Sequence, residues 1–208
     1  MRTLKTANGP KEVILNVQPQ AKDVRDEKYR LKIPRGSLRT VPSAVDNRNI
    51  CSPIRDQGNL GSCTAFAVSG LVESAYNQTA QQWMPSWLRI FFKVGQNKIS
   101  TLFQYYASRV IENSVNEDSG ATIRGSVKAV ANFGAVGESK WPYQISKFRT
   151  NPPGSVWAEA KQRKARSYHP IADGDLETMK ALLSEGKLIT FGFRVYDYML
   201  SQDMAVHG

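Results

Sequence analysis

Residues 57–67 read QGNLGSCTAFA, a segment in which one cysteine stands between small residues at the start of a helical pattern. A cysteine attacks as its thiolate, and the unpaired N–H groups and the dipole at a helix N-terminus favour that negative charge. Small neighbours such as Gly61 and Ser62 let a substrate backbone come close. The backbone N–H of Cys63 and the side-chain amide of Gln57 are suited to stabilise an oxyanion. The segment therefore predicts that Cys63 is a nucleophile, with a small buried thiol as the alternative.

Four further motifs follow this segment in order along the chain. They are LFQYY at 102–106, EDSGATIR at 117–124, ESKWPY at 138–143 and GKLITFGF at 186–193. Together with DQGNLGSCTAFA at 56–67, they resemble the papain-like cysteine peptidases (the C1 family). The resemblance is strongest to prokaryotic and viral-type members, which read Asp-Gln-Gly-x-x-Gly-Ser-Cys-Thr. It covers about residues 40–200.

The chain departs from the papain signature, Cys-Gly-Ser-Cys-Trp, at two positions. Leu60 replaces the first cysteine, and Thr64 replaces the aromatic residue. The second departure removes whatever the aromatic ring contributes to the pocket beside the nucleophile.

The resemblance implies a role for each residue that matches the family motifs. Cys63 would be the nucleophile and Gln57 the oxyanion-hole side chain. Gly120 and Ala121 would lie near the wall of the substrate cleft, where an extended peptide pairs with the backbone. The implied fold is α+β with two lobes, one helical and one resembling a β-barrel, and the cleft lies between them.

The hydrophobic pattern predicts helices first and a strand late, which also indicates an α+β protein with segregated lobes. The predicted helices are 65–76, a stripe at Trp83, Trp87, Ile90 and Phe91, 101–111 behind a capping box at Thr101–Gln104, 120–133 ended by Gly134, and 176–183 between Asp175 and Gly186. Residues 188–196 alternate between apolar and polar side chains, which predicts a strand.

These patterns divide the chain into an arm and one domain. Residues 1–45 are polar and basic, with four prolines and no helical period, so we expect an extended arm. Residues 46–208 are expected to form the papain-like domain. Within it, 46–155 would be the mainly helical lobe and 156–208 the truncated start of the β lobe.

A cysteine nucleophile needs a base, normally a histidine that a third group orients, and the sequence holds two histidines. His169 falls where the family register puts the entry strand of the second lobe. His207 follows Cys63 by 144 residues, inside the family's window of roughly 130–150 residues. No later strand would hold its ring, however, and no later Asn would orient it. We therefore expect that the chain ends before the catalytic His and Asn.

Three interpretations of the missing base stay open. The chain is a fragment of a longer or processed enzyme, a partner chain completes the second lobe, or the product is a truncated pseudo-peptidase. The apolar edge at 188–196 is expected to need a cover in each case, because an exposed edge strand promotes aggregation.

The net charge of +10 is concentrated in the arm, where ten Lys and Arg stand against four Asp and Glu. This balance suits an acidic partner or a polyanion such as nucleic acid, and a solvated basic tail is the simpler alternative. No known nucleic-acid motif is present, and aromatic residues do not alternate with Lys and Arg as a stacking platform requires. Nucleic acid is therefore a less favoured partner than a polypeptide substrate.

Cysteine usage and hydropathy bear on the compartment. Cys51 and Cys63 are too few for a secreted disulfide framework, and Cys51 is expected to be a buried free thiol. The first 30 residues lack the apolar core of a signal peptide, and no apolar run is long enough to span a membrane. We expect no cofactor and no metal, and a location in the cytoplasm or in a particle assembled there, such as a virion.

Two functions on this fold compete. The first is a cysteine endopeptidase that hydrolyses polypeptides through an acyl-enzyme at Cys63, and its sign is a thiolate below neutral pH. The second is a catalytically inactive scaffold or binding component of a larger assembly, in which Cys63 titrates as an ordinary thiol.

Overall fold

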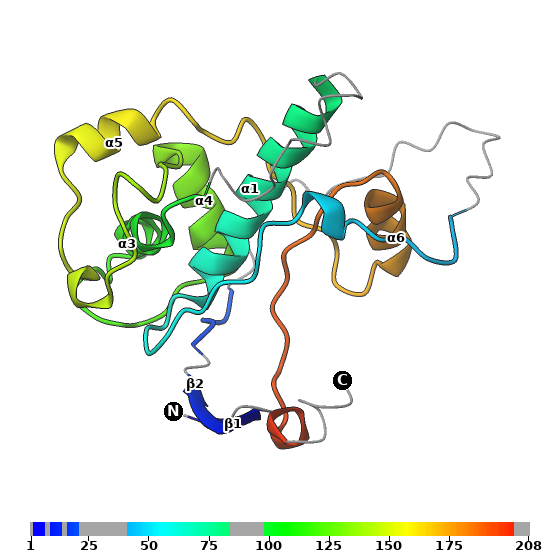
Figure 1. The fold of residues 1–208 in the computed structure, drawn as a ribbon, viewed down its shortest axis with the longest axis horizontal. Helices are drawn as coiled ribbons and strands as arrows, with labels where there is room; N and C mark the ends of the chain where they lie inside the picture. Colours follow the sequence, from blue (N-terminus) through cyan, green and yellow to red (C-terminus); the bar gives the residue numbers. More distant parts are fainter. Residues whose placement is uncertain (1, 7–8, 14–15, 21–40, 84–97, 202–208) are drawn as a thin grey trace.

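The computed structural model describes residues 2–6, 9–13, 16–20, 41–83 and 98–201 (Figure 1). The α-helices in these ranges are α1 (Cys63–Trp83), α3 (Thr101–Ile111), α4 (Ile123–Phe133), α5 (Gly154–Ala160) and α6 (Leu176–Ser184). The 3-10 turns are η1 (Arg48–Ile50), η2 (Ile145–Lys147) and η3 (Asp197–Leu200). The helices predicted at 101–111 and 176–183 are confirmed, and so are those predicted at 65–76 and 120–133, although the first of these two runs from Cys63 to Trp83 and the second begins only at Ile123. Trp87, Ile90 and Phe91 lie outside the described residues.

Helices α1, α3 and α4 pack against one another, and two buried clusters hold them in place (Figure 1). One cluster fills the space between α3, α4 and α5 and contains Phe103, Ala107, Ala129, Val136, Val156 and Ala160. The other joins the start of α1 to α3 and contains Leu60, Ala65, Leu102, Tyr105 and Ala121. Because Leu60 and Ala121 share the second cluster, apolar packing fixes the loop before Cys63 against the segment before α4.

The α3 helix is capped by Ser100, one residue before the predicted capping box. The Ser100 hydroxyl oxygen accepts a hydrogen bond from Phe103 N at 3.1 Å, and the hydroxyl donates to the carbonyl of Trp141. The box predicted at Thr101–Gln104 was therefore wrong by one residue. Thr101 is already the first helical residue, and its buried hydroxyl has no partner in the described part of the chain.

Replacing Ser100 with Ala is expected to lower the free energy of unfolding by about 1–2 kcal/mol, because the first turn of α3 loses its cap. Urea denaturation of both forms measures this difference. Thr101→Val is the matched control, and we expect it to be nearly neutral because it exchanges a hydroxyl that bonds to nothing described for a methyl group of similar size. Equal losses in the two variants would contradict the assignment of the cap.

The predicted helix ends at Gly134, Asp175 and Gly186 are confirmed. Gly134 follows α4 with a φ of 88°, and an added Cβ would overlap the carbonyl oxygen of Ala160. Asp175 caps α6, because its carboxylate accepts from Thr178 N at 3.0 Å. Gly186 follows the helix with a φ of 75°. These positions are where glycine or a short acidic residue is favoured at a helix end.

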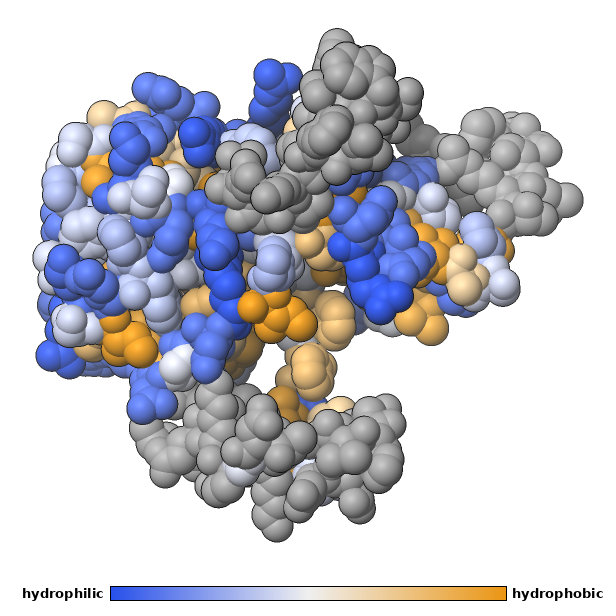
Figure 2. All heavy atoms as spheres, viewed as in Figure 1, coloured by the Kyte–Doolittle hydropathy of each residue, from blue (hydrophilic) through white to orange (hydrophobic). Residues whose placement is uncertain are grey.

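The strand predicted at 188–196 is wrong for the described chain. Figure 1 shows this segment running as an extended length of chain from α6 to η3, and no strand is formed there. A strand is stabilised by hydrogen bonds to a neighbour, and no described segment pairs with this one. Its apolar side chains stay exposed as a result: Phe191 is 68% and Phe193 64% accessible. In Figure 2, hydrophobic residues mark the same connection where it leaves the main body.

Part of the N-terminal arm folds back on the helices. Strands β1 (Arg2–Thr6) and β2 (Gly9–Val13) pair as an antiparallel hairpin, and residues 16–20 then run along the helical body. Val17 forms a parallel bridge with Ala121, just before α4. No helix among the described residues combines the length and the apolar character needed to cross a membrane.

Candidate active site

Cys63 is half-buried and is the first residue of α1. The Ser62 carbonyl accepts the first helical hydrogen bond, from Phe66 N at 3.1 Å, so Ser62 holds the N-cap position. The backbone N–H groups of Cys63 and Thr64 at this helix end lower the pKa of the Cys63 thiol. The structure therefore places the predicted nucleophile in the first turn of a helix, as the sequence pattern indicated.

Burial raises the pKa of the Cys63 thiol above its usual value. The negative charge of Asp118 acts in the same direction, whereas the helix N–H groups and the backbone of Asn16 lower the pKa. Burial is the largest of these effects, so the described arrangement favours the thiol. A cation beside the sulfur, such as an imidazolium, would shift this balance towards the thiolate.

Gln57 lies in the turn that precedes α1. Its Nε2 donates to the carbonyl of Leu60 at 3.0 Å, which fixes the side chain against its own loop. Gly58 reverses the chain with a φ of 60°, and its N–H donates to Asp56 Oδ1 at 2.9 Å. An amide nitrogen carries two protons, so the bond to Leu60 orients the Gln57 amide and is compatible with a second acceptor such as an oxyanion.

Tyr143 holds the loop from outside. Its hydroxyl donates to the carbonyl of Gln57 at 2.8 Å and lies 2.7 Å from Ser62 Oγ. A phenol has one proton, and a carbonyl can only accept, so Ser62 is the donor in the second bond. Burial raises the pKa of Tyr143 to about 12, which keeps this donor protonated. The Tyr143 hydroxyl thus hydrogen-bonds both ends of the 57–62 loop.

Asp118 and the residues after it form the opposite wall. The N–H of Gly61 donates to both carboxylate oxygens of Asp118, at 3.0 and 3.1 Å. Gly120 and Ala121 are buried immediately beyond, and Gly120 has a φ of 74°, which favours glycine. The predicted residues Cys63, Gln57, Gly61, Ser62, Gly120 and Ala121 are therefore brought together in one site.

The chain's own arm lies in this site. Gln18 N donates to Ala121 O at 3.2 Å, and Gln18 Nε2 donates to Ser119 O at 2.6 Å. Asn16 Nδ2 donates to Asp118 O at 3.1 Å. An added Cβ on Gly120 would overlap the Asn16 carbonyl oxygen. The wall thus pairs with an extended peptide backbone, which is what the resemblance implied for Gly120 and Ala121.

The backbone of the arm also reaches the nucleophile. The backbone of Asn16 lies close enough to the Cys63 sulfur to lower the pKa of the thiol. The arm therefore occupies the site as a bound peptide backbone.

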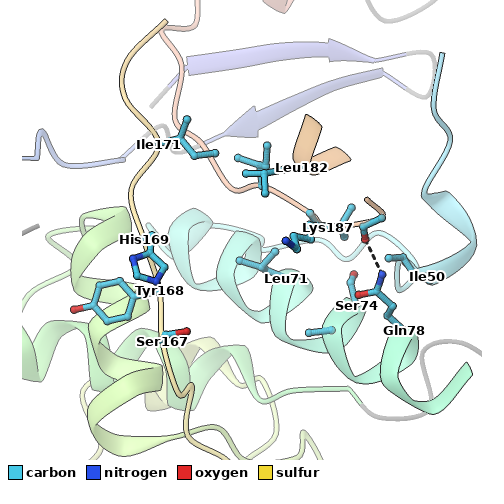
Figure 3. A pocket seen from close by; sticks show the side chains of 14 residues that line it. Ile50, Leu71, Ser74, Gln78, Ser167, Tyr168, His169, Ile171, Leu182 and Lys187 are labelled. Carbon is cyan, nitrogen blue, oxygen red and sulfur yellow. Dashed lines mark hydrogen bonds between the residues drawn. The ribbon is translucent and has the colours of Figure 1, made fainter. Parts of the chain in front are cut away.

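His169 lies in a different part of the molecule. It lines a pocket of about 330 Å³ beside the second half of α1, with Leu71, Gln78 and Leu182 (Figure 3). Leu71 is eight residues beyond Cys63, which corresponds to roughly 12 Å along the helix axis. His169 is thus separated from the sulfur, and His207 lies outside the described residues.

The other cysteine stands apart from the site. Cys51 is a free, half-buried thiol that donates to Asn47 O at 3.5 Å. Across the described ranges, no three His, Cys, Asp or Glu side chains cluster as metal ligands would.

Sequence reasoning missed the residues that hold the site from a distance. Asp118, Tyr105 and Tyr143 were recognised only as parts of family motifs, without a role. Asn16 and Gln18 were assigned to an extended arm with no position. The contacts of Asp118 with Gly61, of Tyr143 with Gln57 and of the arm with the wall span 57 to 102 residues in sequence, and one sequence carries no local signal for contacts at such separations.

The chain is similar to proteins of the kind that the motifs indicated. It is 36% identical over 162 residues to an uncharacterized peptidase C1-like protein of Acanthamoeba polyphaga mimivirus, in a match that covers 74% of this chain and 48% of the relative. The chain thus spans about half the length of that curated relative. In structure it resembles xylellain, a cysteine protease from Xylella fastidiosa, with a TM-score of 0.64, 26% identity, and coverage of 89% of this chain and 66% of that one. No protein-family model matches the chain.

These similarities agree with the motifs and with the geometry of the site. The resemblance of this chain to the papain-like cysteine peptidases of the C1 family is therefore confirmed. The barrel-like second lobe is not seen within the described residues, where the helical part of the fold predominates.

Proposed function

We propose that this chain provides the nucleophile and the oxyanion donors of a papain-like cysteine endopeptidase, which acts on extended polypeptides. The arm supplies the observation that carries this proposal. Residues 16–18 lie extended against Ala121 and Ser119 and pass over the Cys63 sulfur. A cleft that pairs with polypeptide backbone beside a thiol at a helix N-terminus suits peptide-bond hydrolysis.

The chemistry proposed for this site has two steps. The Cys63 thiolate attacks the carbonyl carbon of the peptide bond, and the oxyanion is stabilised by the Cys63 N–H and Gln57 Nε2. The leaving amine takes a proton from an imidazolium, and the acyl group stays on sulfur. Water then attacks the thioester, gives its proton to the imidazole, and releases the acid and the thiolate. The residue that supplies the imidazole lies outside those described.

A second function is favoured by one observation. The pKa of Cys63 is raised, chiefly by burial, which is the behaviour expected of an inactive scaffold that retains the fold. In that case, the segment 188–196, with the exposed rings of Phe191 and Phe193, would bind a partner chain. We also infer a reducing compartment, since Cys51 and Cys63 are both free.

A peptidyl epoxide at pH 5.5, followed by intact-mass analysis, tests the proposed function. We expect one adduct on the parent protein and on Cys51→Ala, and none on Cys63→Ala, since only a thiolate with a bound peptide backbone reacts efficiently under acid conditions. With a peptide substrate, Gln57→Ala is expected to reduce turnover by about 10²–10³-fold. Absence of both adduct and turnover in natively sourced protein would favour the scaffold.

A further inference from the structure

Asp118 connects the cleft wall to the loop that carries the oxyanion donors. Its two carboxylate oxygens accept from a single N–H, that of Gly61, at 3.0 and 3.1 Å. Gly61 stands two residues before Cys63 and four after Gln57. An added Cβ on Gly61 would lie 2.9 Å from Asp118 Oδ1, so glycine is what lets the carboxylate approach. The loop is therefore fixed near its centre by a charged acceptor from another part of the chain.

Asp118 is itself held rigidly. The Tyr105 hydroxyl donates to Asp118 Oδ1 at 2.5 Å and accepts from Gly120 N at 3.2 Å. Burial and the bond to Asp118 raise the pKa of Tyr105, so the phenol stays protonated as a donor. Arg109 fixes the preceding segment, because its Nη1 donates to the carbonyl of Glu117 at 3.1 Å. The carboxylate thus has a donor on the α3 side and another on the loop side.

We propose that Asp118 is a positioning residue of this site. Its carboxylate, which Tyr105 holds in place, fixes the Gly61 N–H and thereby the geometry of the loop at 57–62. Its negative charge destabilises the thiolate form of Cys63. The Tyr143 contacts fix Gln57 and Ser62 from the other side, so Asp118 and Tyr143 hold the loop between them. The catalytic consequence rests on the proposed function, whereas the effects on the loop and on the thiol do not.

The two parts of the proposal respond to different substitutions. Asp118→Asn removes the charge and keeps an oxygen that can accept from Gly61 N. Asp118→Ala removes both the charge and the acceptor. Tyr105→Phe keeps the charge and removes the donor that holds the carboxylate. Charge and geometry can therefore be separated with three variants, each made in a Cys51→Ala background so that Cys63 is the single thiol.

The first measurement is the pH dependence of Cys63 alkylation by iodoacetamide, which requires no catalysis. Removal of a nearby negative charge favours the thiolate. We expect the midpoint of the rate profile to fall in Asp118→Asn and Asp118→Ala, and to stay in place in Tyr105→Phe. An unchanged midpoint in both Asp118 variants would overturn the electrostatic part, because a purely structural role would not move it selectively.

The second measurement is amide hydrogen exchange in peptides that cover residues 56–63. We expect exchange there to become about 10-fold faster in Asp118→Ala, and somewhat faster in Tyr105→Phe, but close to the parent rate in Asp118→Asn. Exchange in α4 serves as the internal control. Equal exchange in the parent and Asp118→Ala would overturn the positioning role. If the parent lacks peptide turnover, the proposed function fails, while these two measurements still decide the role of Asp118.

Discussion

A chain that lacks residues 1–20 is expected to react with iodoacetamide at Cys63 on the order of 10–100-fold faster than the full chain at neutral pH. The arm makes several hydrogen bonds to the wall, including those of Gln18 with Ala121 and Ser119. Each such bond contributes about 0.5–1.5 kcal/mol net, and about 1.4 kcal/mol corresponds to a factor of ten in the open population. We expect iodoacetamide to reach the sulfur only when the arm has left the site. Removing the arm therefore increases the alkylation rate by the ratio of the open populations, on the order of 10–100-fold.

Point variants within the full chain give a graded version of the same test. Gln18→Pro removes the main-chain donor to Ala121 and the side-chain donor to Ser119, whereas Gln18→Ala removes only the second. The alkylation rate is expected to increase in the order parent, Gln18→Ala, Gln18→Pro and the shortened chain. All rates are measured in a Cys51→Ala background, by mass. Equal rates in all four forms would mean that residues 16–20 do not limit access to Cys63.

Removing the arm has two opposite effects on the pKa of the Cys63 thiol. Removing the arm removes the Asn16 backbone bond, which lowers the pKa of Cys63, and also removes part of the burial that raises it. Because burial is the larger influence, we expect the shortened chain to show a midpoint below that of the full chain. A rate profile across pH 5 to about 10 separates this shift from the change in access.

Local sequence signals predicted the parts of the fold that depend on neighbouring residues. The helix that begins at Cys63, the cap at Asp175 and the C-terminal Gly134 were all recognised because caps and apolar periodicity act over a few residues. The cap of α3 was displaced by one residue, since Thr101 and Ser100 offer the same hydroxyl and only the backbone conformation distinguishes them.

The features that the sequence did not predict depend on distant partners. The alternation at 188–196 is a sound strand pattern, but a strand also needs a neighbour, and none is present among the described residues. The hydrogen bond from Tyr143 to Gln57 joins residues 86 apart in sequence, and the bond from Asn16 to Asp118 joins residues 102 apart. Nothing in the composition of either segment identifies the other, so these contacts emerge only when the core has brought α1, α3 and α4 together.

Replacing Arg109 with Ala is expected to lower the free energy of unfolding by about 3–5 kcal/mol, the largest stability effect that we predict. The Arg109 side chain has no solvent exposure. Its Nη1 donates to Val115 O at 2.8 Å and Glu117 O at 3.1 Å, and its Nη2 donates to Phe148 O. The substitution leaves these carbonyls without their donor and opens a cavity, and each unsatisfied buried acceptor costs about 1–3 kcal/mol.

Arg149 provides the matched control for this prediction. The guanidinium groups of Arg109 and Arg149 both lie over the Phe148 ring, at 5.2 and 4.9 Å from its centroid, but Arg149 is exposed. Arg149→Ala is therefore expected to change the unfolding free energy by less than about 0.5 kcal/mol. Urea denaturation monitored by circular dichroism compares the two variants with the parent, and a loss below about 1 kcal/mol in Arg109→Ala would contradict the assignment of a structural cation.

The same substitution also reaches the site, because Arg109 holds the carbonyl of the residue just before Asp118. Its guanidinium lies 4.1 Å from the centroid of the Tyr105 ring, whose hydroxyl donates to Asp118. Arg109→Lys retains the charge but not the planar fork that serves several carbonyls at once, so we expect intermediate stability and faster amide exchange at 56–63. Such coupling would mean that the geometry around Cys63 is set by a buried cation in α3 as much as by the loop that carries the cysteine.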